Sequence, residues 1–184
     1  EKKYRLKEKL FLVEGYKNVK EVLASDFKIE QLFATHSFLE RTPDFEKAKQ
    51  ISEVTKEEIN KASLLMSPQN ALALCALPEN KPLPENLDSL SLFLDEIQDP
   101  GNLGTIIRIC DWFGIKQLFC SPGCADLFNP KVIQATMGSF CRVKVWNSEF
   151  LPVSQLAQKS GSVITGAFLD GENIFTEKLP EKTL

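Results

Sequence analysis

The stretch between residues 92 and 120 constrains the fold most, because it joins two apolar runs through one helical pattern. Leu92–Leu94 and Ile115–Cys120 have the composition of buried strands. Between them, Asp99-Pro100-Gly101 interrupts the first run, since proline fixes φ and glycine permits a positive φ. Asn102 is a favourable helix cap, and we expect the following helix to end at Gly114 and to bury Ile106, Ile109, Cys110 and Phe113. The stretch predicts a β-loop-α-β unit of a parallel α/β sheet, with its loop at the carboxyl edge, where such sheets bind ligands.

Arg108 interrupts a run of isoleucines in this predicted helix. At helical spacing its side chain points away from the apolar face. One interpretation is an ordinary exposed arginine on an amphipathic helix. The other is a guanidinium directed at a phosphate or a ribose beside the Asn102 loop, because guanidinium groups bind phosphates through paired hydrogen bonds. Spacing alone leaves both interpretations open.

The composition is that of an ordinary globular chain. Of its 184 residues, 43% are apolar and 26% charged, the net charge is −3, and no apolar run is long enough for a membrane span. The five cysteines lie mostly in apolar runs, which favours reduced thiols and a cytoplasmic location. With His36 as the only histidine, we expect neither a metal site nor serine–histidine catalysis. Residues 1–20 nevertheless carry seven Lys/Arg against three Glu, as a solvated face or an RNA contact would.

Residues 94–114 carry a motif of fixed spacing, Leu94-Asp95-x-x-x-Asp99-Pro100-x-Asn102-x-Gly104-x-x-x-Arg108-x-x-x-x-Phe113-Gly114. It resembles the first motif of the SpoU (TrmH-type) RNA 2′-O-methyltransferases, in the SPOUT superfamily. The resemblance implies transfer of a methyl group from S-adenosylmethionine to a ribose 2′-hydroxyl of rRNA or tRNA, with Arg108 and Asn102 as the catalytic residues. It also implies a homodimer in which Arg108 of one subunit completes the site of the other.

The same resemblance implies a SPOUT-type parallel-sheet methyltransferase domain over residues 87–184. Asn129-Pro130 predicts the start of a helix that Gly138 ends, residues 141–145 alternate as an amphipathic strand, and residues 161–168 predict a further strand. By resemblance, the end of that last strand borders the cofactor cleft with Thr165, Gly166 and Ala167. The family's last two motifs, which form its knot and most of its cofactor pocket, do not occur in the sequence. We therefore expect the domain to lack its knot-forming part.

Residues 1–77 predict a small alternating α/β unit. Thr55 opens a capping box with Glu58, and strands are expected at Leu10–Val13, Ile29–Ala34, Ile51–Val54 and Leu72–Leu77. The segments 10–15 and 67–69 resemble the N-terminal substrate-binding domain of the same enzymes. That domain is similar to the L30e ribosomal-protein fold, an RNA-binding α/β sandwich. Residues 78–86, with three prolines, predict a stiff linker between this unit and the methyltransferase domain.

The partner implied by the resemblance is a structured RNA, with Glu14, Lys17 and Arg142 as candidate contacts. Glu14 is equally explained by charge complementarity at a helix N-terminus, and Arg142 by a solvated charge. Because the cofactor motifs are missing, a non-catalytic RNA-binding module remains an alternative function. A Rossmann-type nucleotide enzyme is disfavoured, because no G-x-G-x-x-G follows the first strand.

Overall fold

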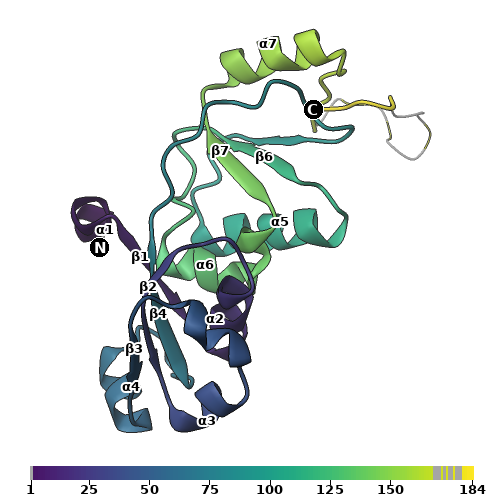
Figure 1. Ribbon diagram of the computed structural model, residues 1–184. Coiled ribbons are helices and arrows are strands. Elements are labelled where there is room, and N and C mark those ends of the chain that lie inside the picture. The colour runs from purple at the N-terminus through teal and green to yellow at the C-terminus, as the bar shows by residue number, and fades with distance from the viewer. Residues whose placement is uncertain (1, 168–170, 172, 174–175, 177–179) are drawn as a thin grey trace.

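The computed structural model describes residues 2–167, 171, 173, 176 and 180–184 (Figure 1). Two β-sheets are separated by a layer that contains the helices α5 and α6. The N-terminal unit comprises α1 (Lys2–Glu8), β1 (Leu10–Glu14), α2 (Tyr16–Leu23), β2 (Ile29–Ala34), α3 (His36–Glu40), the 3₁₀ turn η1 (Pro43–Lys47), β3 (Ile51–Glu53), α4 (Lys56–Ala62) and β4 (Ala71–Ala76). The C-terminal unit comprises β5 (Leu92–Leu94), α5 (Pro100–Trp112), β6 (Gln117–Cys120), α6 (Pro130–Thr136), η2 (Ser139–Cys141), β7 (Lys144–Asn147) and α7 (Phe150–Ser160).

The N-terminal unit is built on a four-stranded sheet in the order β1-β4-β2-β3. β4 is antiparallel to β1 and to β2, whereas β3 is parallel to β2. Buried side chains of α2, including Val19 and Val22, form one core with Phe11 and Leu32 of the sheet. The four predicted strands are confirmed to within one residue at each end. The apolar runs in the sequence were sufficient to predict these strands.

The predicted capping box at the start of α4 is confirmed. The Thr55 hydroxyl accepts a hydrogen bond from the Glu58 backbone N–H at 3.2 Å, and the Glu58 carboxylate accepts one from the Thr55 N–H at 2.8 Å. Two N–H groups that a helix start leaves without partners are thereby satisfied. All the atoms involved lie within four residues, so the local sequence suffices to predict the feature.

The C-terminal unit has a parallel three-stranded sheet in the order β5-β6-β7. All four residues of β6 are buried, because α5 and α6 cover one face of the sheet and α7 the other. The β-loop-α-β unit predicted from residues 92–120 is thus confirmed. No helix among the described residues is both long and apolar enough to cross a membrane.

Two strand predictions for the C-terminal unit need correction. The amphipathic strand expected from Cys141 is wrong at its start, because Val143 N–H donates to Ser139 O in a turn and β7 begins only at Lys144. The strand expected over residues 161–168 is wrong in length. Val163 forms a single parallel bridge with Thr183, which also bridges Leu90, and residue 168 lies outside the described residues.

The two units share a core. Ile133 of α6 and Phe140 of η2 are buried in the apolar cluster of the N-terminal unit. The ring of Phe11 on β1 lies 4.7 Å from that of Phe128, centroid to centroid. Between β4 and β5, the predicted linker packs along the C-terminal unit, where Trp146 Nε1 donates to Pro82 O at 3.0 Å. The units are therefore docked through a hydrophobic interface as well as joined by a linker.

Candidate active site on helix α5

The N-terminus of α5 lies at the carboxyl edge of the parallel sheet. Asp99 is its N-cap, and the Asp99 carboxylate accepts a hydrogen bond from the Asn102 backbone N–H at 2.7 Å. Pro100 occupies the first helical turn, where no N–H is needed. The prediction that Asn102 caps the helix is therefore wrong. Asp at the N-cap followed by Pro at the first helical position is a recognised start signal, and it identifies Asp99 as the cap.

The loop before α5 is held by the loop that follows β6. The Glu96 N–H donates to Ser121 Oγ at 2.9 Å, and the Ile97 N–H donates to Cys124 Sγ at 3.3 Å. Ala125 N–H in turn donates to Ile97 O at 2.8 Å. These bonds cross from one parallel strand end to the next, so they set the position of the helix N-terminus. Ser121 and Cys124 could not be predicted as supports of the site, because nothing in the local sequence links them to residues 96–97.

Helix α5 buries only part of the predicted stripe: Cys110 is buried as predicted and Ile106 is half-buried, but the other two positions are exposed. Leu103, Ile107 and Cys110 are fully buried, whereas Ile109 and Phe113 are 48% and 74% exposed. Both stripes recur at helical spacing, and contact with α6 decides between them. A Cβ on Gly104 would lie 2.4 Å from the Cβ of Ala135 on α6. The motif glycine thus lets α5 and α6 touch and turns the Leu103 face inward.

Asn102, Thr105 and Arg108 lie on the solvent-exposed side of α5. At 1.5 Å rise per residue, Asn102 and Arg108 are about 9 Å apart along the helix axis. Among the residues that the structure describes, neither side chain has a hydrogen-bond or ion-pair partner. The nearby acid on the helix, Asp111, is bound by Arg142 instead. Arg108 thus presents an uncommitted cation that can bind a phosphate or a hydroxyl.

The candidate cofactor residues lie beside the last described strand pairing. Thr165 N–H donates to Leu184 O at 3.0 Å, next to the Val163–Thr183 bridge. Thr165, Gly166 and Ala167 are exposed, and within the described part of the chain the Gly166 and Ala167 backbone groups have no partner. Free backbone N–H and C=O groups are the usual means by which a pocket orients a small polar ligand. Thr165, Gly166 and Ala167 therefore stay candidates for one wall of a cofactor site.

Glu14 and Lys17 flank the start of α2 in different environments. The Glu14 side chain is 4% exposed, and its Oε2 accepts from Ser63 Oγ at 2.6 Å and from Leu64 N–H at 3.0 Å. Lys17 is exposed. The carboxylate of Glu14 therefore anchors the loop 63–70 beside the α2 N-terminus, and Met66 in that loop is wholly exposed.

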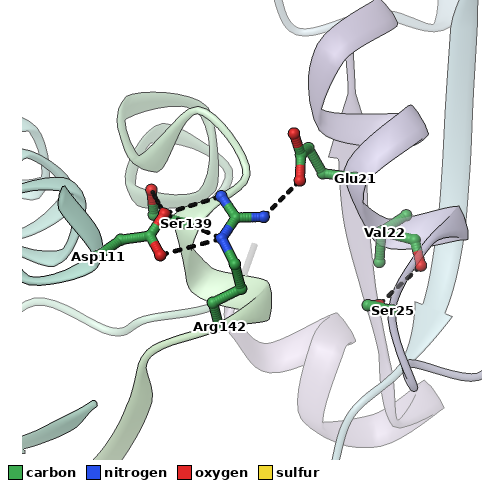
Figure 2. Close-up of polar contacts among 6 residues, drawn as sticks. All are labelled: Glu21, Val22, Ser25, Asp111, Ser139 and Arg142. Carbon is green, nitrogen blue, oxygen red and sulfur yellow. Dashed lines mark hydrogen bonds and ion pairs between the residues drawn. The ribbon is translucent and has the colours of Figure 1, made fainter. Parts of the chain in front are cut away.

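Arg142 lies at the junction of the two units (Figure 2). Its Nε and Nη2 donate to the Asp111 carboxylate of α5 at 3.0 and 2.8 Å, and its Nη1 donates to Glu21 of α2. Ser139 Oγ donates to the same Asp111 oxygen at 2.8 Å. The hydrogen bonds from Arg142 lower the pKa of Asp111, and those to Asp111 raise the pKa of Arg142. The Arg142 guanidinium therefore binds two carboxylates within the protein, whereas the sequence also allowed a solvated charge.

The cysteines are all free thiols. Burial raises the pKa of Cys75, Cys120 and Cys141 to about 12 and that of Cys110 to about 11, which disfavours a thiolate at neutral pH. No cluster of three potential metal ligands occurs among the described residues. The polar groups that α5 exposes include the guanidinium of Arg108 and the amide of Asn102.

Comparison with known proteins identifies the family. The sequence profile of the SpoU rRNA Methylase family matches residues 89–184, and that of the MRM3-like substrate binding domain matches residues 1–73. The chain belongs to the SpoU rRNA methylase family. The family predicted from the motif around Asn102 and Arg108 is thus confirmed.

Solved structures of SpoU and TrmH proteins share the fold. A TrmH-family protein from Porphyromonas gingivalis is 37% identical, with a TM-score of 0.85 over 98% of this chain and 71% of that one. The AdoMet-bound rRNA methyltransferase from Sinorhizobium meliloti is 23% identical, with a TM-score of 0.84 over 100% of this chain and 72% of that one. The predicted SPOUT-type α/β fold is thereby confirmed, and AdoMet is a ligand of the second of these neighbours.

Named sequence relatives of this SpoU chain are longer than it is. The 23S rRNA (guanosine(2553)-2′-O)-methyltransferase RlmP of Bacillus subtilis is 32% identical over 145 residues, which make up 78% of this chain and 56% of that protein. The human mitochondrial rRNA methyltransferase 3 is 31% identical over 153 residues, or 79% of this chain and 36% of that protein. The chain thus spans little more than half of the first relative and about a third of the second.

Proposed function

We propose that this SpoU protein transfers a methyl group from S-adenosylmethionine to a ribose 2′-hydroxyl of ribosomal RNA. The observation that carries the proposal is the uncommitted guanidinium of Arg108, which is exposed like Asn102 on α5, the helix that begins at the carboxyl edge of the β5-β6-β7 sheet. The names of the B. subtilis and human relatives, both rRNA methyltransferases, support rRNA rather than tRNA as the substrate.

Arg108 acts in this reaction by orientation and charge. A ribose hydroxyl is a weak nucleophile, so a site must align it and stabilise the negative charge that develops as its proton leaves. Because arginine stays protonated in proteins, Arg108 donates hydrogen bonds to the adjacent phosphate or the hydroxyl oxygen and does not serve as the base. Asn102, about 1.7 turns earlier on the helix, can hydrogen-bond the same nucleotide through its amide. S-adenosylmethionine, held in part by residues 165–167, would supply the electrophilic methyl group when bound and would leave as S-adenosylhomocysteine, while the hydroxyl proton would pass to water.

The RNA contact of the N-terminal unit is the surface formed by the start of α2 and the loop 63–70, which we call the α2 edge. Lys17 provides a cation there, and the loop 63–70 provides exposed Leu64 and Met66, which can pack on unstacked bases. The buried carboxylate of Glu14 holds the loop of this surface in place through its hydrogen bonds with Ser63 and Leu64. The Tyr16 N–H donates to Gln69 Oε1 at 2.8 Å and ties the loop to the helix start.

We also infer that the protein is a homodimer that associates through α5. Ile109, Trp112 and Phe113 are 48%, 85% and 74% exposed and form one apolar face on the helix that carries Arg108. Large exposed apolar residues grouped on one face are typical of an interface. A second copy seated on this face would place its own Arg108 beside the first, as the family resemblance implies. The buried free thiols and the bacterial relative support a cytoplasmic location.

The proposal is tested by incubating the complete natural protein with methyl-tritiated S-adenosylmethionine and ribosomal RNA. A 2′-O-methyl group blocks alkaline cleavage of the next phosphodiester, so the label is expected in alkali-resistant dinucleotides. Label released as mononucleotides would place the methyl group on a base and contradict the proposal. RNA binding without any transfer would favour the non-catalytic RNA-binding module.

A further inference from the structure

Arg142 binds both Glu21 of α2 and Asp111 of α5, and we call this contact the Arg142 bridge. It connects α2, the helix of the proposed RNA contact, with α5, the helix of the proposed catalytic group. Glu21 follows Lys17 by four residues on α2, and Asp111 follows Arg108 by three residues on α5. Residues at these spacings are neighbours on a helix surface. Figure 2 shows Arg142 between Glu21 and Asp111, and each of these two acids lies about one helical turn from a residue with a proposed role in methylation.

Gly138 allows α2 to approach the bridge closely. Its φ is +96°, and a Cβ at this position would lie 2.5 Å from Cγ and 2.8 Å from Cβ of Glu21. Any larger residue would both strain the backbone and push Glu21 away. The turn before η2 is therefore shaped to hold Glu21 within reach of Arg142.

The bridge does not act alone in docking the two units. Asn18 Nδ2 donates to Gln134 Oε1 at 2.9 Å, and Arg5 Nη2 pairs with Asp126 at 2.7 Å. The aromatic contact between Phe11 and Phe128 provides the apolar part of the interface. Non-directional apolar contact holds the units together, whereas the ionic contacts select one relative orientation.

We propose that Arg142 is a positioning residue for the methyl transfer. By joining Glu21 to Asp111 it fixes the α2 RNA-binding edge relative to Arg108, and so sets which nucleotide of a docked RNA reaches the catalytic helix. The inference rests on the proposed function and adds a determinant of site selection to it. The substrate it implies is a structured RNA that contacts both units at once, because only such an RNA is sensitive to their relative orientation.

The exposure of the three side chains agrees with a geometric role. Arg142, Glu21 and Asp111 are 48%, 30% and 21% exposed at the side chain. Ion pairs with this degree of exposure contribute little to the free energy of unfolding. A guanidinium that binds a carboxylate through two nitrogens nevertheless requires a strict geometry. It therefore fixes the orientation of α2 relative to α5 while adding little to the free energy of unfolding.

The test uses two variants of the complete protein that disturb the bridge in different ways. Glu21→Lys places a second cation against Arg142, and Gly138→Ala inserts a methyl group against Glu21 without any change of charge. Glu79→Lys, in the exposed linker, is the matched charge control. Three quantities are measured: the dissociation constant for rRNA, the single-turnover methylation rate at saturating RNA, and hydrogen–deuterium exchange of residues 138–143.

Both bridge variants are expected to lower the single-turnover rate by on the order of tenfold or more with little change in RNA affinity, because a misplacement of about 1 Å has effects of this size. Mapping should show methylation spreading to neighbouring nucleotides, which a loss of stability alone would not produce. The control should behave as wild type. A parallel loss of RNA affinity would make this cluster a direct RNA contact and overturn the inference, as would unchanged rates in both bridge variants.

The exchange measurement separates this inference from the proposed function. Faster exchange of residues 138–143 in Glu21→Lys reports a loosened junction even if the wild-type protein methylates no ribose. Wild-type activity with unchanged exchange and an unchanged methylation pattern in both variants would retain the function and refute the positioning role.

Discussion

The Asp99 carboxylate accepts a hydrogen bond from the Asn102 N–H at 2.7 Å, so the two polar residues at the start of α5 have different tasks. Asp99 caps the helix, and the amide of Asn102 has no partner among the residues that the structure describes. Asp99→Ala is expected to lower the free energy of unfolding by about 1 kcal/mol. Asn102→Ala is expected to change it by less than about 0.5 kcal/mol, because its side chain is exposed, yet to reduce methyl transfer.

Urea unfolding and single-turnover methylation distinguish the two variants. The account requires the larger stability loss in Asp99→Ala and a methylation defect in Asn102→Ala. The opposite ranking in stability would restore Asn102 as the cap.

How far sequence predicts this molecule depends on the range of the contacts involved. Thr55 and Glu58 are three residues apart, so their capping box could be predicted. The buried side of α5 could not, because Ile106 and Ile109 fit helical spacing as well as Leu103 and Ile107 do. The choice depends on Gly104 meeting Ala135, which lies 31 residues further along the chain.

The site residues, too, could be predicted only where the contacts that position them are close in sequence. The exposure of Arg108 on α5 was predicted from helical spacing, whereas Asn102, predicted as the cap, is the third residue of the helix. The partners of Arg142 could not be predicted, because Glu21 is 121 residues away and lies on another unit. Glu14, a candidate RNA contact by resemblance, is the buried last residue of β1, and its bond to Ser63 in the distant loop 63–70 could not be predicted from the local sequence.

Gly104→Ala is expected to destabilise the protein. The added Cβ would lie 2.4 Å from the Ala135 Cβ and 2.8 Å from the Val132 carbonyl oxygen, and backbone cannot yield as a flexible side chain does. Overpacking of this kind lowers the free energy of unfolding by about 1–3 kcal/mol despite the better helix propensity of alanine. Urea denaturation measures the loss, with Gly101→Ala in the exposed first turn as the control. An unchanged midpoint would show that α5 and α6 do not pack this closely.

Trp112→Ser is expected to weaken self-association. The indole is 85% exposed in the single chain, so its removal should leave the monomer folded while it takes apolar area from the inferred dimer interface. Sedimentation equilibrium measures the dimer dissociation constant, and Leu6→Ser on α1, 61% exposed, is the control. Equal association in both variants and the wild type would exclude the α5 face.

His36 is expected to titrate above its ordinary pKa. A hydrogen bond to Glu53, and then the charge of Glu40, raise the pKa of this imidazole. Because the folded value exceeds the unfolded one, the contribution to stability is present below about pH 6.5 and is lost as the pH rises through the raised pKa. As the only histidine, His36 gives a single set of imidazole resonances, so its titration can be followed by NMR.

Glu53→Gln should lower the pKa of His36 toward the ordinary value. An unshifted titration in the wild type would mean that the Glu53 contact does not persist in solution. The measurement concerns the cleft at the carboxyl ends of β2 and β3, which Thr35, His36 and Glu53 help to line.

The role of Arg108 is tested most directly by the single-turnover rate of methyl transfer in Arg108→Ala, at saturating rRNA and S-adenosylmethionine. The account predicts a rate reduced by on the order of 100-fold or more, with an unchanged unfolding midpoint, because the exposed side chain has no protein partner among the described residues to lose. A rate equal to that of the wild-type protein would contradict the assignment of Arg108 to the reaction.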